Sequence, residues 1–301
     1  MRGLGKRATG AGVAAIFLAG LLAGVTVQPA LAQPAAAPVA KPDTALAAAV
    51  AGSWRSPQNR ARDAYRHPLE SLTFWGLKPG ATVVEIEPGA HGWWTEILGP
   101  YLKATGGTYV AALPDRDDSS LSADGKAERV KATAAFWSGV DDHTLYGKVE
   151  AYDFGPQHTD ALPAGSADLV LVARAFHNWA QSGDQTDVYL KAFYRALKPG
   201  GILAVEQHRA PEGSDPKAGT GYVPESYVIA AAERAGFVLD GRSEINANPK
   251  DTRDYPFGVW TLPPTRRSSA FGQPADPAFD HSRYDAIGES DRMTLRFRKP
   301  G

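Results

Sequence analysis

Apolar and polar positions along the chain follow two periods, which predict strands interleaved with helices. Short apolar runs between turn residues are typical of buried strands, whereas apolar residues spaced three or four apart favour helices. The expected strands are 81–87, 107–113, 148–153, 167–173, 200–207, 237–244 and 291–299. The expected helices are 60–75, 93–102, 124–137, 185–197 and 224–235. This order predicts a doubly wound α/β domain, a largely parallel Rossmann-like sheet with helices on both faces.

The segment between the last two expected strands has no such period. About 46 residues separate Glu244 from Asp291, and they are rich in proline, glycine, aspartate and arginine. A loop of this length inside a compact domain is usually functional. Tyr255, Phe257 and Trp260 supply apolar surface that can fold back onto the body. We expect a long lid loop over a binding site; the alternative is a surface excursion without a function.

The N-terminus has the pattern of an export signal. Three basic residues stand among the first seven, an apolar run follows over 12–27, and Ala30-Leu31-Ala32 provides small residues for cleavage. The sequence therefore predicts a signal peptide over residues 1–32 and a periplasmic or secreted protein. An uncleaved membrane anchor is the alternative, although the apolar run is barely long enough to cross a bilayer.

Composition narrows what the remaining chain can do. Residues 33–51 form a Pro/Ala-rich tether, and residues 52–301 fit one domain. The chain has no cysteine, which excludes disulfides and cysteine metal sites. Without the first 32 residues, 29 Lys and Arg stand against 33 Asp and Glu, so the charge gives no support for general nucleic-acid binding. After signal cleavage we expect no membrane association.

The first strand runs into a glycine-bearing turn, VVEIEPGAHGWW, in which Glu85 is followed by Glu87, Gly89 and Gly92. In an open parallel sheet, ligands gather at the carboxyl ends of the strands, and this turn is the usual cradle. Glycine permits positive φ and close backbone approach. Because tight turns also need glycine for purely structural reasons, the turn alone is a weak signal.

Further motifs along the chain carry a family resemblance. A helix ends in LKPGG and passes into an apolar strand, and ALPAGSADLVLVARAFHNW lies between this motif and VVEIEPGAHG. Over residues 72–209 the chain resembles the class I S-adenosylmethionine-dependent methyltransferases. With FHNW, INANPKDT and WTLPP it is also similar to a group of secreted bacterial predicted methyltransferases. The resemblance implies a methyltransferase-type sheet with an antiparallel C-terminal strand, S-adenosylmethionine as cofactor and methyl transfer to a small-molecule acceptor.

The resemblance also assigns roles to residues. The acid ending the first strand and the loop glycines hold the amino acid half of the cofactor, the acid after the second strand binds the ribose, and an acid–aromatic pair frames the adenine. Here the ribose acid stands late and Glu87 replaces the first loop glycine. The candidate cofactor-binding residues are Glu85, Glu87, Gly89, Gly92, Asp115, Asp153, Phe154 and Arg174.

Polar residues after the fourth and fifth strands form the candidate catalytic group, His177, Glu206 and His208. A histidine at this edge can act as general base toward an acceptor hydroxyl or amine. Methyl transfer itself needs little beyond in-line positioning. The alternative is that Arg174 and Glu206 form a structural ion pair and the histidines are satisfied rim residues.

Metal binding is a separate possibility, because histidine and carboxylate side chains suit zinc or iron. The residues that could converge are His67, His91, His177, His208, Glu87 and Glu206. No HxH or HExxH spacing is present, and we predict no metal site.

Tryptophan positions divide into two groups. Trp75, Trp93, Trp94 and Trp137 lie on apolar stripes of expected helices and are predicted to anchor the core. Trp179 and Trp260 stand beside polar loop motifs and are candidates for ligand packing.

Two functions of different classes remain open. The first is an S-adenosylmethionine-dependent methyltransferase with a small-molecule acceptor. The second is a catalytically inactive protein of the same fold that binds or senses a small ligand, which the altered first loop favours.

Overall fold

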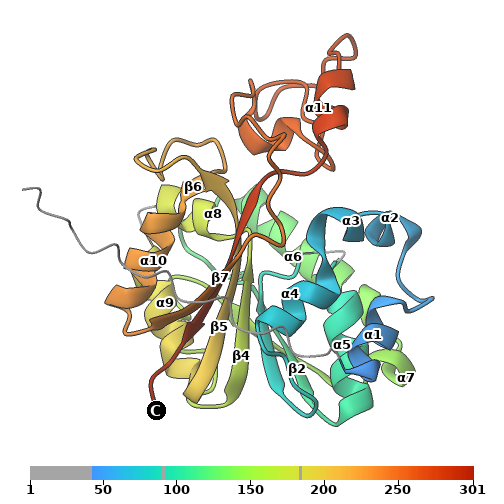
Figure 1. Ribbon diagram of the computed structural model, residues 1–301, viewed down its shortest axis with the longest axis vertical. Coiled ribbons are helices and arrows are strands. Elements are labelled where there is room, and N and C mark those ends of the chain that lie inside the picture. Colours follow the sequence, from blue (N-terminus) through green and yellow to red (C-terminus); the bar gives the residue numbers. More distant parts are fainter. Residues whose placement is uncertain (1–42, 90–91, 183–184) are drawn as a thin grey trace, which may run out of the picture. The chain divides into compact units, whose positions relative to one another are not determined.

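The computed structural model describes residues 43–89, 92–182 and 185–301 (Figure 1). The strands are β1 Thr82–Ile86, β2 Thr108–Pro114, β3 Val149–Phe154, β4 Ala167–Ala173, β5 Leu197–Ala210, β6 Val223–Pro224, β7 Val238–Ser243 and β8 Arg292–Arg298. The helices are α1 Thr44–Val50, α2 Pro57–Arg60, α3 Asp63–Arg66, α4 Pro68–Phe74, α5 Thr95–Thr105, α6 Ala123–Gly139, α7 His143–Tyr146, α8 Phe176–Gln181, α9 Thr186–Ala196, α10 Glu225–Arg234 and α11 Ser282–Ile287, with a 3₁₀ turn η1 over Gly258–Thr261.

The sheet has the strand order β3-β2-β1-β4-β5-β8-β7, and the short β6 pairs with β5. Neighbours from β3 to β5 run parallel, whereas β8 is antiparallel to both β5 and β7. This is the α/β Rossmann-like methyltransferase fold, and the predicted fold class is confirmed. The chain reverses its direction of strand addition between β1 and β4, so a topological switch point lies there.

Helices cover both faces of the sheet and define two apolar cores (Figure 1). Alternate residues of β4 serve them in turn: Val170 and Val172 pack with α8, α9 and α10, whereas Leu169 and Leu171 pack with α1, α4 and α5. The period of two along a strand buried on both faces explains why this segment is continuously apolar.

The helix predicted over 60–75 is instead three short helices, α2, α3 and α4. His67 has φ 40°, in the left-handed region, directly before Pro68 at the start of α4. A residue before proline is disfavoured in the right-handed helical region, so the helix breaks there. The break turns Arg66, the last residue of α3, inward, where it is fully buried.

The folded domain begins earlier than residue 52, which corrects the boundary drawn after the predicted tether. Asp43 caps α1 by accepting the backbone N–H of Leu46 at 2.6 Å, and it also accepts the hydroxyl of Tyr101 at 2.7 Å. Leu46 and Ala49 are buried. The predicted signal peptide and the start of the tether lie outside the described residues.

The long segment over residues 245–290, here called the cap, folds on the body above the sheet (Figure 1). It contains η1 and α11, and Tyr255, Val259 and Leu262 are buried with Tyr222 in a small apolar cluster. The expected folding of this apolar surface onto the body is thus confirmed, whereas the structure tests neither a lid motion nor the alternative of a surface excursion without a function.

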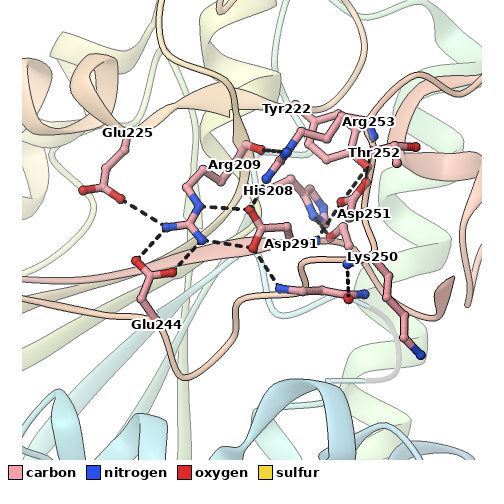
Figure 2. Close-up of polar contacts among 12 residues, drawn as sticks. His208, Arg209, Tyr222, Glu225, Glu244, Lys250, Asp251, Thr252, Arg253 and Asp291 are labelled. Carbon is pink, nitrogen blue, oxygen red and sulfur yellow. Dashed lines mark hydrogen bonds and ion pairs between the residues drawn. The ribbon is translucent and has the colours of Figure 1, made fainter.

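Buried polar contacts fasten the base of the cap to β5 and β8 (Figure 2). The Asp251 carboxylate accepts the hydroxyls of Tyr222 and Tyr255 and, at 2.7 Å, the backbone N–H of Asp291. Arg253 donates to the carbonyl of Arg209 at 2.7 Å and to Asp291 at 2.5 Å. The INANPKDT motif, with Asp251, thus fixes where the cap leaves the sheet.

Arg209, at the end of β5, ties the surrounding elements together (Figure 2). It donates two hydrogen bonds to Asp291 and two to Glu244, and it lies 3.8 Å from Glu225 of α10.

None of the described helices is long and apolar enough to span a bilayer.

Candidate functional site

A polar cavity of about 250 Å³ lies at the carboxyl ends of β1, β4 and β5. The body contributes Arg66, Glu87, Arg174, His177 and His208, and the cap contributes Trp260 and Glu289. Ligands of open α/β sheets bind at this edge, next to the switch point.

Two larger hollows lie elsewhere, and the second of them is lined in part by Gly92 at the end of the first loop. One, of about 630 Å³, is at the opposite, amino edge of the sheet between the two LKPG turns at residues 77–80 and 197–200. The other, of about 750 Å³, lies among α2, α5 and α6. The small cavity is the better candidate, because it alone of the three gathers histidine with several buried charged side chains.

Strained backbone surrounds this cavity. Glu87, at the end of β1, has φ 50°, and Arg174, at the end of β4, has φ 59°. Both are bulky residues in the left-handed region that glycine adopts more easily, a conformation that costs about 1–3 kcal/mol. Glu87 stands where the family resemblance places a loop glycine, and its positive φ is one that glycine adopts more easily. Such strain collects at ligand sites, and here it aims two charged side chains at one cavity.

Glu85 in β1 is buried behind this loop. Its Oε2 accepts hydrogen bonds from Thr95 Oγ1 at 3.0 Å and from the Tyr109 hydroxyl at 2.7 Å. Burial raises the pKa of Glu85 to about 7, and the two hydroxyl donors lower it only partly. Glu85 does not line the cavity.

Glu87 is half-buried and accepts a hydrogen bond from Trp179 Nε1 at 3.4 Å. Burial raises the pKa of Glu87. Trp179 itself is buried among Phe176, Tyr189 and Phe193, so its predicted role in packing a ligand is wrong. Trp137, predicted to anchor the core, is 42% exposed.

The residues predicted to hold the nucleoside are occupied by the protein's own groups. Asp115 is buried and accepts from His158 Nδ1 at 2.8 Å and from the backbone of Asp117 at 3.0 Å. Asp153 pairs with Arg116 through contacts of 2.6–3.2 Å. Phe154 packs on Tyr189 and Phe193 in the core. None of the three predicted residues lines the cavity.

Glu206 is fully buried and pairs with Arg292 of β8, whose Nη1 lies 3.0 Å from Oε1. The predicted catalytic role for Glu206 is therefore not supported by its position, since it does not reach the cavity. The alternative pairing with Arg174 is also wrong as drawn. The backbone N–H of Arg174 donates to the carbonyl of Glu206 at 2.7 Å. The Arg174 side chain, however, has no hydrogen bond or ion pair with any other described residue.

Glu289 organises a cluster of arginines at the cavity wall. It accepts Arg62 Nε at 2.5 Å, Arg66 Nε at 3.0 Å and Arg292 Nη2. Burial alone would raise the pKa of Glu289, but the charges of these three arginines outweigh it and hold the pKa well below its usual value. Sequence reasoning missed Arg66, Glu289 and Arg292, because their pairing joins α3 to β8 across the fold.

The two histidines are neutral at pH 7. Burial lowers the pKa of His177 to about 4 and that of His208 well below its usual value. Gln207 Nε2 lies 3.1 Å from the carbonyl of Gly221 and 3.3 Å from His177 Nδ1. The carbonyl fixes this amide nitrogen as a donor, so His177 Nδ1 accepts and its proton sits on Nε2. His208 Nδ1 contacts Ser290 Oγ at 2.5 Å.

The candidate site residues thus do not all share one cavity. Those that meet are Glu87, Arg174, His177 and His208, whereas Glu85, Asp115, Asp153, Phe154 and Glu206 lie elsewhere. Gly89 has φ 73°, and a Cβ at this position would meet open space. Gly92 has φ 36°, and a Cβ there would clash with the Thr95 side chain. Among the described residues, no group of three or more histidines and acids is placed to hold a metal; His91 lies outside them.

Comparison with known proteins agrees with the fold. Residues 131–205 match a family model described as a methyltransferase domain, about a quarter of the chain. No curated protein matches the chain.

Many solved structures are similar in fold. A SAM-dependent methyltransferase from Aquifex aeolicus is 22% identical, covering 64% of this chain and 88% of that chain with a TM-score of 0.45. A protein described as a sarcosine dimethylglycine methyltransferase, from Galdieria sulphuraria, is 14% identical, covering 74% of this chain and 80% of that chain with a TM-score of 0.47. The [4+2]-cyclase SpnF is 14% identical, covering 83% of each chain with a TM-score of 0.49.

The sheet order gives an α/β protein with the Rossmann-like methyltransferase fold and a polar cavity at its switch point, and the match over residues 131–205 agrees with that fold. The matched model describes a methyltransferase domain, which supports S-adenosylmethionine as the cofactor class independently of the loop at residues 83–92.

Proposed function

We propose that the protein transfers a methyl group from S-adenosylmethionine to a small-molecule acceptor held in the cavity. The observation that carries the proposal is the meeting of Glu87 and Arg174, both on strained backbone, at one polar cavity beside the switch point. The methyltransferase-domain match over residues 131–205 supports it. When bound, S-adenosylmethionine supplies the methyl group on a sulfonium centre.

The residues present fit one half of that cofactor better than the other. The open backbone at Gly89 suits the amino acid half, although Glu85, expected beside it, is buried and its Oε2 already accepts from Thr95 and Tyr109. Asp115 and Asp153, expected at the ribose and adenine, are already bonded to His158 and Arg116. Binding of the nucleoside half therefore requires these two pairs to exchange partners.

The chain's own residues have positioning roles in this proposal. Trp260 and Val259 of the cap close one wall of the cavity and exclude water from the acceptor. Trp260 packs edge-on against His177, with ring centres 5.7 Å apart, and so holds the imidazole in place. Because Nδ1 of His177 is engaged by Gln207, the imidazole is set to donate from Nε2 and orient an acceptor oxygen.

We also propose that the protein acts outside the cytoplasm, in the periplasm or beyond. The basic start, the apolar run and Ala30-Leu31-Ala32 support export. Intact-mass measurement of the exported protein tests this, and a chain that retains residues 1–32 would contradict it. Because S-adenosylmethionine is made in the cytoplasm, export makes cofactor binding the decisive measurement.

A second candidate function is binding or sensing of a small ligand without the cofactor. It is favoured by Glu87 in place of the loop glycine and by the pairs that occupy Asp115 and Asp153. Retention of the fold does not require retention of the chemistry.

Calorimetric titration of the chain from Gln33 onward with S-adenosylmethionine separates the two functions. Micromolar binding that is lost in Glu85→Ala, with methyl transfer detected by product mass, supports the methyltransferase. Glu128→Ala is the matched control, because Glu128 is an exposed glutamate. Absence of heat at millimolar cofactor would favour the cofactor-free binder.

A further inference from the structure

The charged residues of the cavity do not balance. Its wall carries Arg66, Arg174 and Arg292 against Glu87 and Glu289, and both histidines are neutral at pH 7. Directly behind the wall, Arg62 adds one positive charge and Glu206 one negative charge. One positive charge therefore remains uncompensated when Glu87 is ionised. Burial raises the pKa of Glu87. When that carboxyl is protonated, a second positive charge is left uncompensated.

Several guanidinium nitrogens at this wall lack a partner. Arg66 is fully buried, and of its three nitrogens only Nε is bonded, to Glu289; Nη1 and Nη2 have no hydrogen-bond partner. Its guanidinium also stacks on Trp93, with 4.8 Å to the ring centre, which holds it in place. Leaving such buried donors unsatisfied destabilises the fold unless a partner is supplied.

Arg174 is the second unpaired group. Nothing in the described part of the chain accepts a hydrogen bond from its side chain, and its Nε is buried without a partner. Arg174 sits at φ 59°, so strained backbone places a free cation on the cavity wall. An unpaired guanidinium on strained backbone is costly to the fold, and a bound ligand that accepts its hydrogen bonds would offset that cost.

His177 adds a neutral donor beside these cations. Its Nδ1 is engaged by Gln207, so the proton on Nε2 points away from that bond, and no described residue forms a hydrogen bond with Nε2. Unpaired guanidinium nitrogens and an imidazole N–H are donors only. The missing partner must therefore be an acceptor.

We propose that the cavity binds an oxyanion group, a carboxylate or a phosphate, between Arg66, Arg174 and His177. This names the acceptor class for the proposed methyl transfer and rests on that function for its role as substrate. Planar guanidinium groups match the geometry of both anions. With about 250 Å³, the cavity is smaller than the roughly 300 Å³ at which ligand sites begin, so it takes the anionic head of a molecule rather than a whole cofactor.

Binding of inorganic phosphate and of acetate, measured by calorimetry on the chain from Gln33 onward, tests the site and distinguishes the two anions. Saturable binding of one or both is expected in the wild type. Arg174→Met should weaken it about tenfold or more, because a charge-assisted hydrogen bond is lost. Arg116→Met is the matched control: Arg116 is exposed, pairs with Asp153 and lies outside the cavity, so it should leave anion binding unchanged.

Three further measurements avoid a dependence on one variant. Glu87→Gln removes a negative charge from the wall and should tighten anion binding severalfold, opposite in sign to Arg174→Met. In the wild type, the bound anion should raise the pKa of His177 from about 4, as followed in histidine side-chain NMR spectra. Arg66→Met tests the buried arginine directly, but only where its circular dichroism matches the wild type, because Arg66 also holds Glu289.

The outcomes separate this inference from the proposed function. Anion binding without any S-adenosylmethionine binding would overturn the methyltransferase and leave the oxyanion site standing. Methyl transfer that is indifferent to phosphate, acetate and Arg174→Met would overturn the oxyanion site and leave the methyltransferase standing. Equal weakening by Arg116→Met and Arg174→Met would also overturn it, because the effect would then be general surface charge.

Discussion

The two sides of the sheet's carboxyl edge treat buried charge in opposite ways. On the β1–β3 side, Glu85, Asp115 and Asp153 each have partners supplied by neighbouring strands and loops. On the β4–β8 side, arginines outnumber the carboxylates and keep unpaired nitrogens at a cavity, as Arg66 and Arg174 do. The first side is closed around its acids, whereas the second is incomplete without an acceptor.

Two buried glutamates show that the neighbouring side chains decide whether burial raises or lowers the pKa of a carboxyl. Glu85 lies among hydroxyls, and burial raises its pKa to about 7. Glu289 lies among three arginines, which lower its pKa despite burial. The same side chain thus favours its neutral form on one side and its charged form on the other. The predictions below test this contrast from the largest expected effect to the smallest.

Glu289→Gln should have the largest effect. It leaves Arg62 and Arg66 without a carboxylate and Arg292 with Glu206 alone, and breaking a buried ion pair in this way costs about 3–5 kcal/mol. Urea denaturation at pH 7 measures the loss, with the exposed Glu128→Gln as control. A loss no larger than that of the control would contradict the cluster's role.

The pH dependence of Glu289 has a definite sign. Its folded pKa is depressed, so its contribution is present above the unfolded value of about 4.5 and is lost as pH falls below it. The stability difference between wild type and Glu289→Gln should therefore shrink on acidification below pH 4.5.

Glu85→Gln should have the next effect, with the opposite sign. The folded pKa of Glu85 is raised, so its protonated form contributes stability below the unfolded value of about 4.5, and this is lost as pH rises through about 7. Relative to Glu85→Gln, the wild type should lose up to about 3 kcal/mol between pH 4 and pH 8. Urea denaturation of both proteins across this range gives the difference, and a constant difference would mean that the pKa of Glu85 is not raised.

Local pattern in the sequence was sufficient for the fold and insufficient for the site. All seven expected strands form. Central strands such as β4 are apolar runs buried on both faces of the sheet, and the run itself indicates that burial, whereas the edge strands β3 and β7 are only partly buried. Polar residues at strand ends were also placed correctly where position alone decides, as for Arg174 and His177.

The rest depended on contacts between distant segments. Asp153 was expected at an adenine, but Arg116, 37 residues earlier in the chain, pairs with it. Glu206 was expected at the cavity, but Arg292 draws it into the interior. Arg66 contacts Glu289, 223 positions later in the sequence, because the helix is interrupted at His67. No spacing rule relates these partners, so only the folded topology reveals them.

Arg116→Met should have the smallest effect on stability and the most informative one on binding. The Arg116–Asp153 pair is at the surface, so its loss should cost less than about 1 kcal/mol in urea denaturation. The same change frees the Asp153 carboxylate, the acid expected to accept from an adenine amine. If that pair is what closes the β1–β3 side, affinity for S-adenosylmethionine should rise by up to about fivefold in calorimetry, because the cofactor no longer has to displace a guanidinium.

Arg298→Met, which breaks a comparable exposed pair with Asp240 at the far end of β8, is the control and should leave the affinity unchanged. An affinity that falls in Arg116→Met would mean that Arg116 contacts the cofactor itself, and the contrast between a closed and an incomplete side would then have to be abandoned.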